Sequence, residues 1–136
     1  MIEHTRDFRR VKRLSDANPP FGLDPWDIKI QHDVFYLVEK NKKDIGVWCF
    51  EPHEEGYLMH AAMGPECRGG KAVSSALDAI DWFFTNTSND HFFAAVPEQY
   101  KHVHVICRNT GLWHLKNKDR YRVYTMTKNQ FYKKAA

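Results

Sequence analysis

The sequence predicts an α/β fold with a mixed sheet, in which an antiparallel meander precedes a strand–helix–strand crossover. Three β-branched and aromatic segments between residues 34 and 63 are separated only by short polar turns, as in consecutive antiparallel strands. An apolar stripe at helical spacing follows them, and then another strand-like segment. The length of 136 residues and the apolar content of 43% predict one domain, with an N-terminal helical segment (1–29) and a core (30–136).

The N-terminal segment is predicted to form a helix over residues 5–17, because Phe8, Val11 and Leu14 lie near helical spacing. This helix is also the most basic part of the chain. Its cations suit either a solvated surface or a phosphate-binding patch. The net charge is only +3 and no aromatic stacking motif accompanies the cations, so nucleic-acid binding is the weaker hypothesis. A proline-rich loop is expected at residues 18–25.

The rest of the chain alternates strands with two long helices. The crossover helix carries the apolar stripe between Val73 and Phe84, and a second helix is predicted over Pro97–Asn109, with Gly111 just past its end. Further strand material is expected in residues 111–117. The predicted strands are Val34–Lys40, Ile45–Pro52, Tyr57–Met63, His91–Val96 and Tyr121–Lys128.

The crossover predicts where a ligand would bind. A strand–helix–strand unit over Tyr57–Val96 makes its two strands parallel and its connection right-handed. Open sheets of this kind bind ligands outside the carboxyl ends of their parallel strands, and Met63–Gly70 would lie there.

The stretch PECRGGKAV (Pro65–Val73) has the chemistry of a phosphate-binding loop. A helix N-terminus offers free amides and partial positive charge to an anion. Gly69 and Gly70 would allow close backbone approach, and Arg68 and Lys71 would add charge-assisted contacts. A glycine pair before a helix is also a common plain turn, so both interpretations stay open on these residues alone.

With this order of elements, residues 30–128 resemble the GNAT acyltransferase fold, which binds acetyl-CoA. The family loop is often written P-E-Y-R-G-x-G-x-G/A, and Pro65, Glu66, Arg68 and Gly69 match it without gaps. Lys71 and Val73 then stand where small residues are usual. In a register shifted by one, Gly70 and Ala72 match instead, and Cys67 replaces the family's Arg or Gln.

The resemblance implies a splayed central strand pair, acetyl-CoA as cosubstrate and a CoA site whose amides hold the pyrophosphate. Carried over to this sequence, the implied CoA site comprises Met63, Arg68, Gly69, Gly70, Lys71, Ala72 and Val73.

A second resemblance lies in VPEQYKHVHVICRNTGL, where the family commonly has V-P-E-x-N and a helix ending in G-F. Tyr100 stands at the usual Asn, and the frequent tyrosine acid of the family falls at Cys107. Cys107 is therefore either a substitute acid or a small buried apolar residue. His60 is the candidate base because an imidazole titrates near neutrality, and its alternative is a half-buried strand histidine. Glu54 and Glu55 are the runner-up bases.

Metal binding and secretion are not expected. Among the eight histidines, His102 and His104 fall on different helix faces, and no Cys or carboxylate joins them at ligand spacing. Three cysteines without a CxxC pair indicate a reducing, cytoplasmic location. No apolar run reaches the length of a membrane span.

Two functions follow from the resemblance. The first is a small acetyl-CoA-dependent N-acetyltransferase acting by direct attack in a ternary complex. The loop texture looks most like phage-encoded members of the fold, some of which resemble head-assembly or internal virion proteins of short-tailed phages. The departures at Lys71, Val73, Tyr100 and Cys107 therefore favour a second function, a catalytically inactive structural or assembly protein of a phage particle. Such a protein would self-associate or bind phage structural proteins, in the host cytoplasm or the virion.

Overall fold

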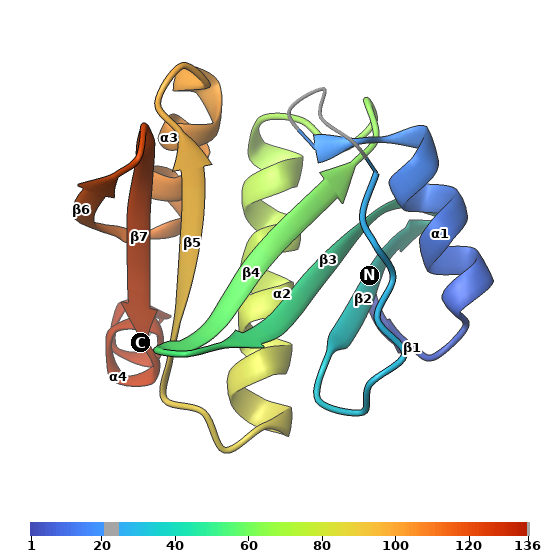
Figure 1. Cartoon of the computed structure of the whole chain (residues 1–136), viewed down its shortest axis with the longest axis horizontal. Coiled ribbons are helices and arrows are strands. Elements are labelled where there is room, and N and C mark those ends of the chain that lie inside the picture. Colours follow the sequence, from blue (N-terminus) through green and yellow to red (C-terminus); the bar gives the residue numbers. More distant parts are fainter. Residues whose placement is uncertain (21–24, 136) are drawn as a thin grey trace.

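The computed structural model describes residues 1–20 and 25–135 (Figure 1). Residues 21–24 of the loop predicted at residues 18–25 lie outside them. The described strands are β1 Ile2–Thr5, β2 Phe35–Asn41, β3 Lys43–His53, β4 Gly56–Met63, β5 His91–Pro97, β6 Trp113–Lys118 and β7 Tyr121–Thr127. The described helices are α1 Phe8–Ala17, α2 Gly70–Asn86, α3 Lys101–Thr110 and α4 Lys128–Ala135.

The strands form one mixed sheet in the order β1-β2-β3-β4-β5-β7-β6. Every neighbouring pair is antiparallel except β4 and β5, which are parallel and joined through α2. The β2–β3–β4 meander pairs Leu37 with Trp48 and then Trp48 with Ala61. The predicted meander and crossover are therefore confirmed.

The parallel pair at the centre of the sheet is splayed, as expected. β4 and β5 share only two registered pairs, Tyr57 with Phe92 and Leu58 with Phe93. Beyond these pairs the two strands diverge toward their carboxyl ends, and α2 begins at the open end of the divergence (Figure 1). The carboxyl end of β4 and the N-terminus of α2 thus lie at the same edge of the sheet.

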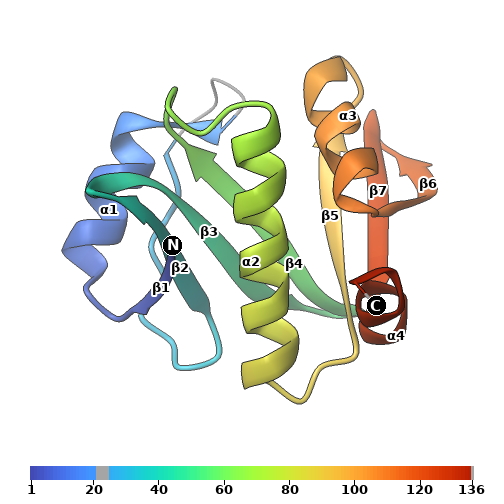
Figure 2. The same ribbon diagram turned by 180° about the vertical axis from the view of Figure 1, so that it is seen from behind.

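Helices cover both faces of the sheet. α2 and α3 lie on one face, and α1 lies on the opposite face over β3 and β4 (Figures 1 and 2). The main core fills the α2 face, where Phe83 stacks on Phe50 at a ring separation of 4.3 Å. Phe84, Phe92 and Ile80 are fully buried around this pair. The apolar stripe of the crossover helix therefore faces the strands, as its spacing predicts.

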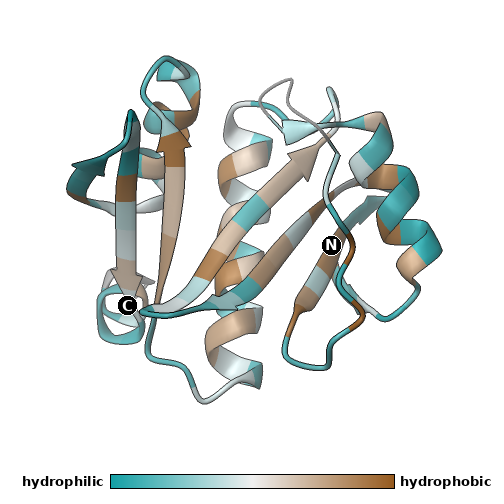
Figure 3. Ribbon diagram, in the orientation of Figure 1, coloured by the Kyte–Doolittle hydropathy of each residue, from teal (hydrophilic) through white to brown (hydrophobic). Residues whose placement is uncertain are grey.

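A smaller core lies under α1, where Val11 and Leu14 pack against Tyr36, Val38 and Val47. The outer face of α1 is largely hydrophilic, in contrast to the apolar β5 (Figure 3). Arg10 fixes this helix to the sheet: its Nε and Nη2 donate to the Asp44 carboxylate at 2.7 and 2.8 Å, and Nη1 donates to Glu3 at 2.7 Å.

The N-terminal prediction was wrong at its start. Residues 2–5 form β1, an edge strand that pairs Ile2 with Glu39 and Thr5 with Tyr36. Helix α1 then begins at Phe8 because Asp7 caps it, accepting the Arg10 N–H at 3.2 Å. The first 29 residues are therefore part strand and part helix.

Two further differences concern the C-terminal third. Pro97 ends β5 instead of opening a helix, and α3 begins four residues later, at Lys101. Helix α4 was not predicted, although Thr127 and Gln130 form a capping box in which each side chain bonds the other's backbone N–H, at 3.0 and 3.2 Å. The predicted stop at Gly111 is confirmed by its left-handed φ of 98°.

Candidate functional site

The loop between β4 and α2 is anchored on the sheet by its middle. The Gly64 N–H donates to the Ile45 carbonyl at 2.8 Å, and the Cys67 N–H donates to the Gly64 carbonyl at 3.0 Å. The Cys67 side chain is buried in a small cluster with Ile45 and Ala72, whereas Arg68 is exposed. A buried Cys67 cannot stand for an exposed cation, which favours the ungapped register in which Arg68 and Gly69 match the family loop.

The glycine pair opens α2 without obstruction. Gly69 is the N-cap residue, with φ 54° and ψ −126°, a conformation that strongly favours glycine. Gly70 is the first helical residue, and a Cβ added at either glycine would meet no atom of the described residues within 4 Å. Gly69 itself has no side chain with which to cap the helix, and no described side chain bonds the first amides in its place. The Lys71 N–H donates to the Arg68 carbonyl at 3.1 Å, which leaves the amides of Gly70 and Ala72 as the donors without a backbone partner among the described residues.

Two cations, Arg68 and Lys71, lie beside this helix end. Arg68 and Lys71 are exposed, and within the described residues neither takes part in an ion pair. The acidic residue of the loop, Glu66, pairs instead with Lys43 at 3.0 Å. Ala72 points into the small core and Val73 is half-buried. Met63, at the end of β4, is half-buried against both neighbouring clusters.

His60 lies on the other face of the sheet. Its neighbours Met59 and Ala61 pack into the α2 core, so the strand alternation turns His60 toward α1. There it lines a cavity of about 200 Å³ together with Trp26, Asp27, Lys29, Tyr36, Cys49 and Glu51. Two hydrogen bonds hold the segment that contributes Trp26, Asp27 and Lys29 to this cavity. The Trp26 N–H donates to Ser15 Oγ at 2.7 Å, and the Lys29 N–H donates to the Tyr36 hydroxyl at 2.9 Å.

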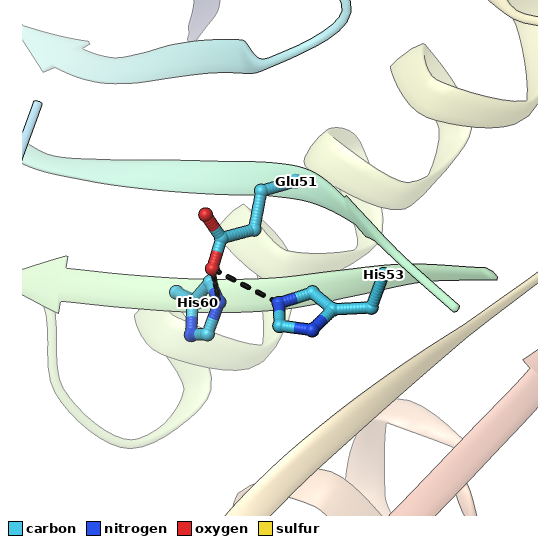
Figure 4. Close-up of side chains that lie close together, drawn as sticks. All are labelled: Glu51, His53 and His60. Atoms are coloured by element: carbon cyan, nitrogen blue, oxygen red, sulfur yellow. Dashed lines mark hydrogen bonds and ion pairs between the residues drawn. The ribbon is translucent and has the colours of Figure 1, made fainter. Parts of the chain in front are cut away.

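Glu51 is the hub of this cavity (Figure 4). Its Oε1 lies 2.9 Å from His60 Nε2 and 3.2 Å from His53 Nε2, and its Oε2 accepts from Lys29 Nζ at 2.8 Å. The hydrogen bond from His60 lowers the pKa of Glu51 far below its usual value; burial opposes this, and the bonds from Lys29 and His53 reinforce it. Because a carboxylate only accepts, Nε2 of His60 must donate, which leaves the lone pair of a neutral His60 on Nδ1.

Glu51 is not among the site residues predicted from the sequence. The runner-up bases Glu54 and Glu55 are exposed in the turn between β3 and β4. The strand period places Glu51 and His53 on one face of β3, and the register pairs Cys49 with His60, so Glu51 and His60 are diagonal neighbours. The ligand atoms of Glu51, His53 and His60 lie within 4.8 Å of one another, a cluster that spacing along one helix could not reveal.

Cys107 lies on α3, in the main core, and is 9% exposed. Burial raises the pKa of its thiol to about 12, above the value of about 8.5 for an ordinary cysteine. This buried environment fits the interpretation of Cys107 as a small apolar packing residue. Its role as an acid stays a prediction. The nearby His104 is buried, with Nδ1 2.7 Å from the Tyr124 hydroxyl and Nε2 2.9 Å from the Pro97 carbonyl oxygen.

Much of the basic charge at the N-terminus has partners within the chain. Besides the Arg10 contacts, Arg6 donates to the carbonyls of Gln31 and Val34, and Lys12 pairs with Asp16. All three cysteines are free and buried. Among the described residues, no helix combines the length and apolarity needed to cross a membrane.

Comparison with known proteins finds no matching family model and no matching curated protein. Solved structures do match. A spermidine N-acetyltransferase SpeG mutant from Vibrio cholerae is 12% identical, with 100% of this chain and 99% of that chain covered and a TM-score of 0.75. The ribosomal-protein-S5-alanine acetyltransferase from Vibrio fischeri is 14% identical, with 96% and 93% covered and a TM-score of 0.67.

A third structure, the Campylobacter jejuni N-acetyltransferase PseH in complex with acetyl coenzyme A, is 11% identical over 72% of this chain and 70% of that chain, with a TM-score of 0.62. These neighbours are GNAT N-acetyltransferases. The chain therefore has the mixed α/β fold of the GNAT N-acetyltransferases.

Proposed function

We propose that this protein is an N-acetyltransferase that moves the acetyl group of acetyl-CoA to an amine. The observation that carries the proposal is the uncapped start of α2 at the open end of the splayed β4–β5 pair. The fold supports it, and so does the acetyl coenzyme A bound to the PseH neighbour.

The pyrophosphate of CoA would bind at this helix end. The amides of Gly70 and Ala72 would donate to its oxygens, and glycine at 69 and 70 leaves room for them to approach. Arg68 and Lys71 would add charge-assisted contacts, since neither forms an ion pair with another described residue. Lys71 thus contributes charge where the family usually has a small residue.

The acetyl transfer itself asks little of the protein, because the thioester is already activated. The amine nitrogen attacks the thioester carbonyl, whose oxygen is stabilised by backbone amides near Met63, and the C–S bond then breaks. His60 Nδ1 takes the amine proton, while Glu51 holds the ring through Nε2. Cys107 and water are the two candidate proton sources for the departing thiolate.

Calorimetric titration with CoA and acetyl-CoA tests the binding step. Replacing Arg68 or Lys71 by Ala should weaken binding roughly tenfold or more, as expected for a charge-assisted hydrogen bond. Lys118→Ala is the matched control, because Lys118 is exposed at the far end of β6. Absence of any CoA binding at about 1 mM would refute the proposal, since that concentration detects even a weak site.

The catalytic step is tested separately, by release of the CoA thiol in the presence of a panel of primary amines. His60→Ala should lower kcat by about 10²–10⁴ while leaving the Kd for CoA unchanged. An equal loss in kcat and in CoA affinity would mean that His60 supports the fold and not the proton transfer.

A second candidate is a phage-encoded member that keeps the fold without catalysis and assembles with a phage particle. The buried Cys107 at the position of the family acid favours it, together with Lys71, Val73 and Tyr100 in the family motifs. This candidate predicts self-association or co-purification with phage structural proteins. A monomer that binds CoA and is absent from particles would contradict it.

A further inference from the structure

We propose that Glu51, His53 and His60 form a binding site for a divalent transition-metal ion, with Zn²⁺ as the ion that best fits their chemistry. The three side chains offer two imidazole nitrogens and one carboxylate oxygen, a ligand set that Zn²⁺ accepts while keeping an open position. No metal site was predicted from the sequence, because the three ligands lie on two strands and only the register between those strands brings them together.

The distances are close to those of a zinc site. Ligand atoms about 2.0–2.1 Å from a tetrahedral Zn²⁺ lie about 3.3 Å from one another. Glu51 Oε1 is 2.9 Å from His60 Nε2 and 3.2 Å from His53 Nε2, within about 0.4 Å of that spacing. All three ligand atoms lie within 4.8 Å of one another, so the two imidazole nitrogens need to approach by at most about 1.5 Å.

The sheet holds this arrangement. Glu51 and His53 project from the same face of β3, and the register sets Cys49 opposite His60, so the backbone fixes all three Cβ positions (Figure 4). The side chain of Glu51 is 16% exposed, whereas those of His53 and His60 are 49% and 37% exposed. The carboxylate is thus held in the cavity, and the two rings remain open to an arriving ion and to water as a fourth ligand.

Lys29 should lower the affinity of the site for a metal ion. Its Nζ lies 2.8 Å from Glu51 Oε2, on the oxygen that the histidines leave free, so its positive charge opposes that of the ion. An ion at Oε1 replaces the two imidazole protons that now face Glu51, and each ring then carries its proton on Nδ1. Removal of the lysine charge should therefore tighten metal binding, an effect that a purely structural hydrogen-bond network would not produce.

One consequence rests on the proposed acetyl transfer. With an ion on Nε2 and the proton on Nδ1, His60 has no lone pair for an amine proton, so metal binding and proton transfer through His60 exclude each other. The site would then act as a zinc-sensitive inhibitory switch on the α1 face of the sheet.

The test is calorimetric titration of the full, EDTA-treated chain with ZnCl₂, alongside visible absorption of the Co²⁺-loaded protein. We expect one equivalent bound and Co²⁺ bands of four-coordinate type. His53→Ala should weaken binding by more than about tenfold because it removes a ligand. Lys29→Met should strengthen binding severalfold because it removes a positive charge close to the ion. His102→Ala is the matched control, because His102 is exposed on α3, far from the cluster in the chain.

Equal binding by the His53→Ala and His102→Ala proteins would overturn the proposal, as would weaker binding in Lys29→Met. His53 is exposed beside a turn, so its replacement should leave the fold intact, which far-UV circular dichroism verifies. Both metal readouts need no acetyl-CoA, so they stand if acetyl transfer is absent. Conversely, an active enzyme that binds no Zn²⁺ refutes only the metal site. Zinc inhibition, taken relative to the metal-free rate of each variant, should be weaker in His53→Ala.

Discussion

Replacing the two glycines at the start of α2 by alanine should change stability in opposite directions. Gly69 has φ 54° and ψ −126°, so alanine there must adopt a strained backbone at a cost of about 1–3 kcal/mol. Gly70 is helical, and a Cβ added there would meet nothing within 4 Å in the part of the chain that the structure describes. Alanine at Gly70 should therefore stabilise the protein by about 0.4–1 kcal/mol, because it restricts the unfolded chain.

The same pair separates folding from ligand binding. If the first amides of α2 hold the pyrophosphate of CoA, a methyl group at either position intrudes on the ligand, so both variants should lose about tenfold or more in CoA affinity, or at least 1.4 kcal/mol. Gly70→Ala would then be more stable than the parent and yet bind CoA more weakly. That combination is the expected result, because packing in the free protein does not require a glycine at position 70.

Urea denaturation followed by circular dichroism gives the two stability changes, and calorimetry gives the CoA affinities. A Gly70→Ala protein that binds CoA as tightly as the parent would refute the assignment of the anion to this helix end. A Gly69→Ala protein of unchanged stability would contradict the backbone geometry of the loop.

Three further outcomes follow from the packing and charge of the described residues. Arg10→Met should lower the free energy of unfolding by about 1–2 kcal/mol at neutral pH, because it leaves the Asp44 carboxylate without its ion-pair partner. Arg10 lowers the pKa of Asp44, so this contribution is fully present above about pH 4 and is lost as the pH falls through the folded-state pKa; denaturation at several pH values should show the two proteins converging in acid. Phe83→Ala should lower the free energy of unfolding in urea by about 3–5 kcal/mol, because it leaves a cavity where the Phe83 ring stacks on Phe50. A decrease below about 1 kcal/mol would contradict this packing. Burial raises the pKa of all three thiols, so Ellman's reagent should react slowly with the native protein. After unfolding, three thiols per chain should react. One thiol that reacts fast in the native protein would show that a cysteine is accessible.

The sheet and its crossover helix were predictable because their apolar residues recur with the period of a strand or a helix. The apolar stripe of α2 and the β-branched runs of β2, β3 and β4 each bury one defined face. β1 escaped prediction because IEHT is short and polar, and its stability comes from pairing with residues 36–39, far along the chain. α4 carried a visible Thr127–Gln130 capping box, but too few apolar residues to mark a helix.

The candidate site was only partly predictable for a related reason. The α2 loop is local in sequence, so its glycines and cations could be identified directly. The Glu51–His53–His60 cluster depends on which residue of β3 stands opposite His60, and a one-residue change of register would send these side chains to different faces. Register across a turn is set by the folded hairpin, so Glu51 could be found only once the pairing was known.

The short contact between β4 and β5 has a mechanical consequence. The sheet consists of two half-sheets, β1–β4 and β5–β7–β6, each held by long ladders but joined to the other through two residue pairs at one end. Among the described strands no other ladder joins the halves, so elsewhere they are connected by side-chain packing in the main core, as between Phe50 of β3 and Phe92 of β5. A molecule that binds at the open end would lie between the two half-sheets. Its binding should therefore alter amide hydrogen exchange along β4 and β5 and leave β1–β3 unaffected.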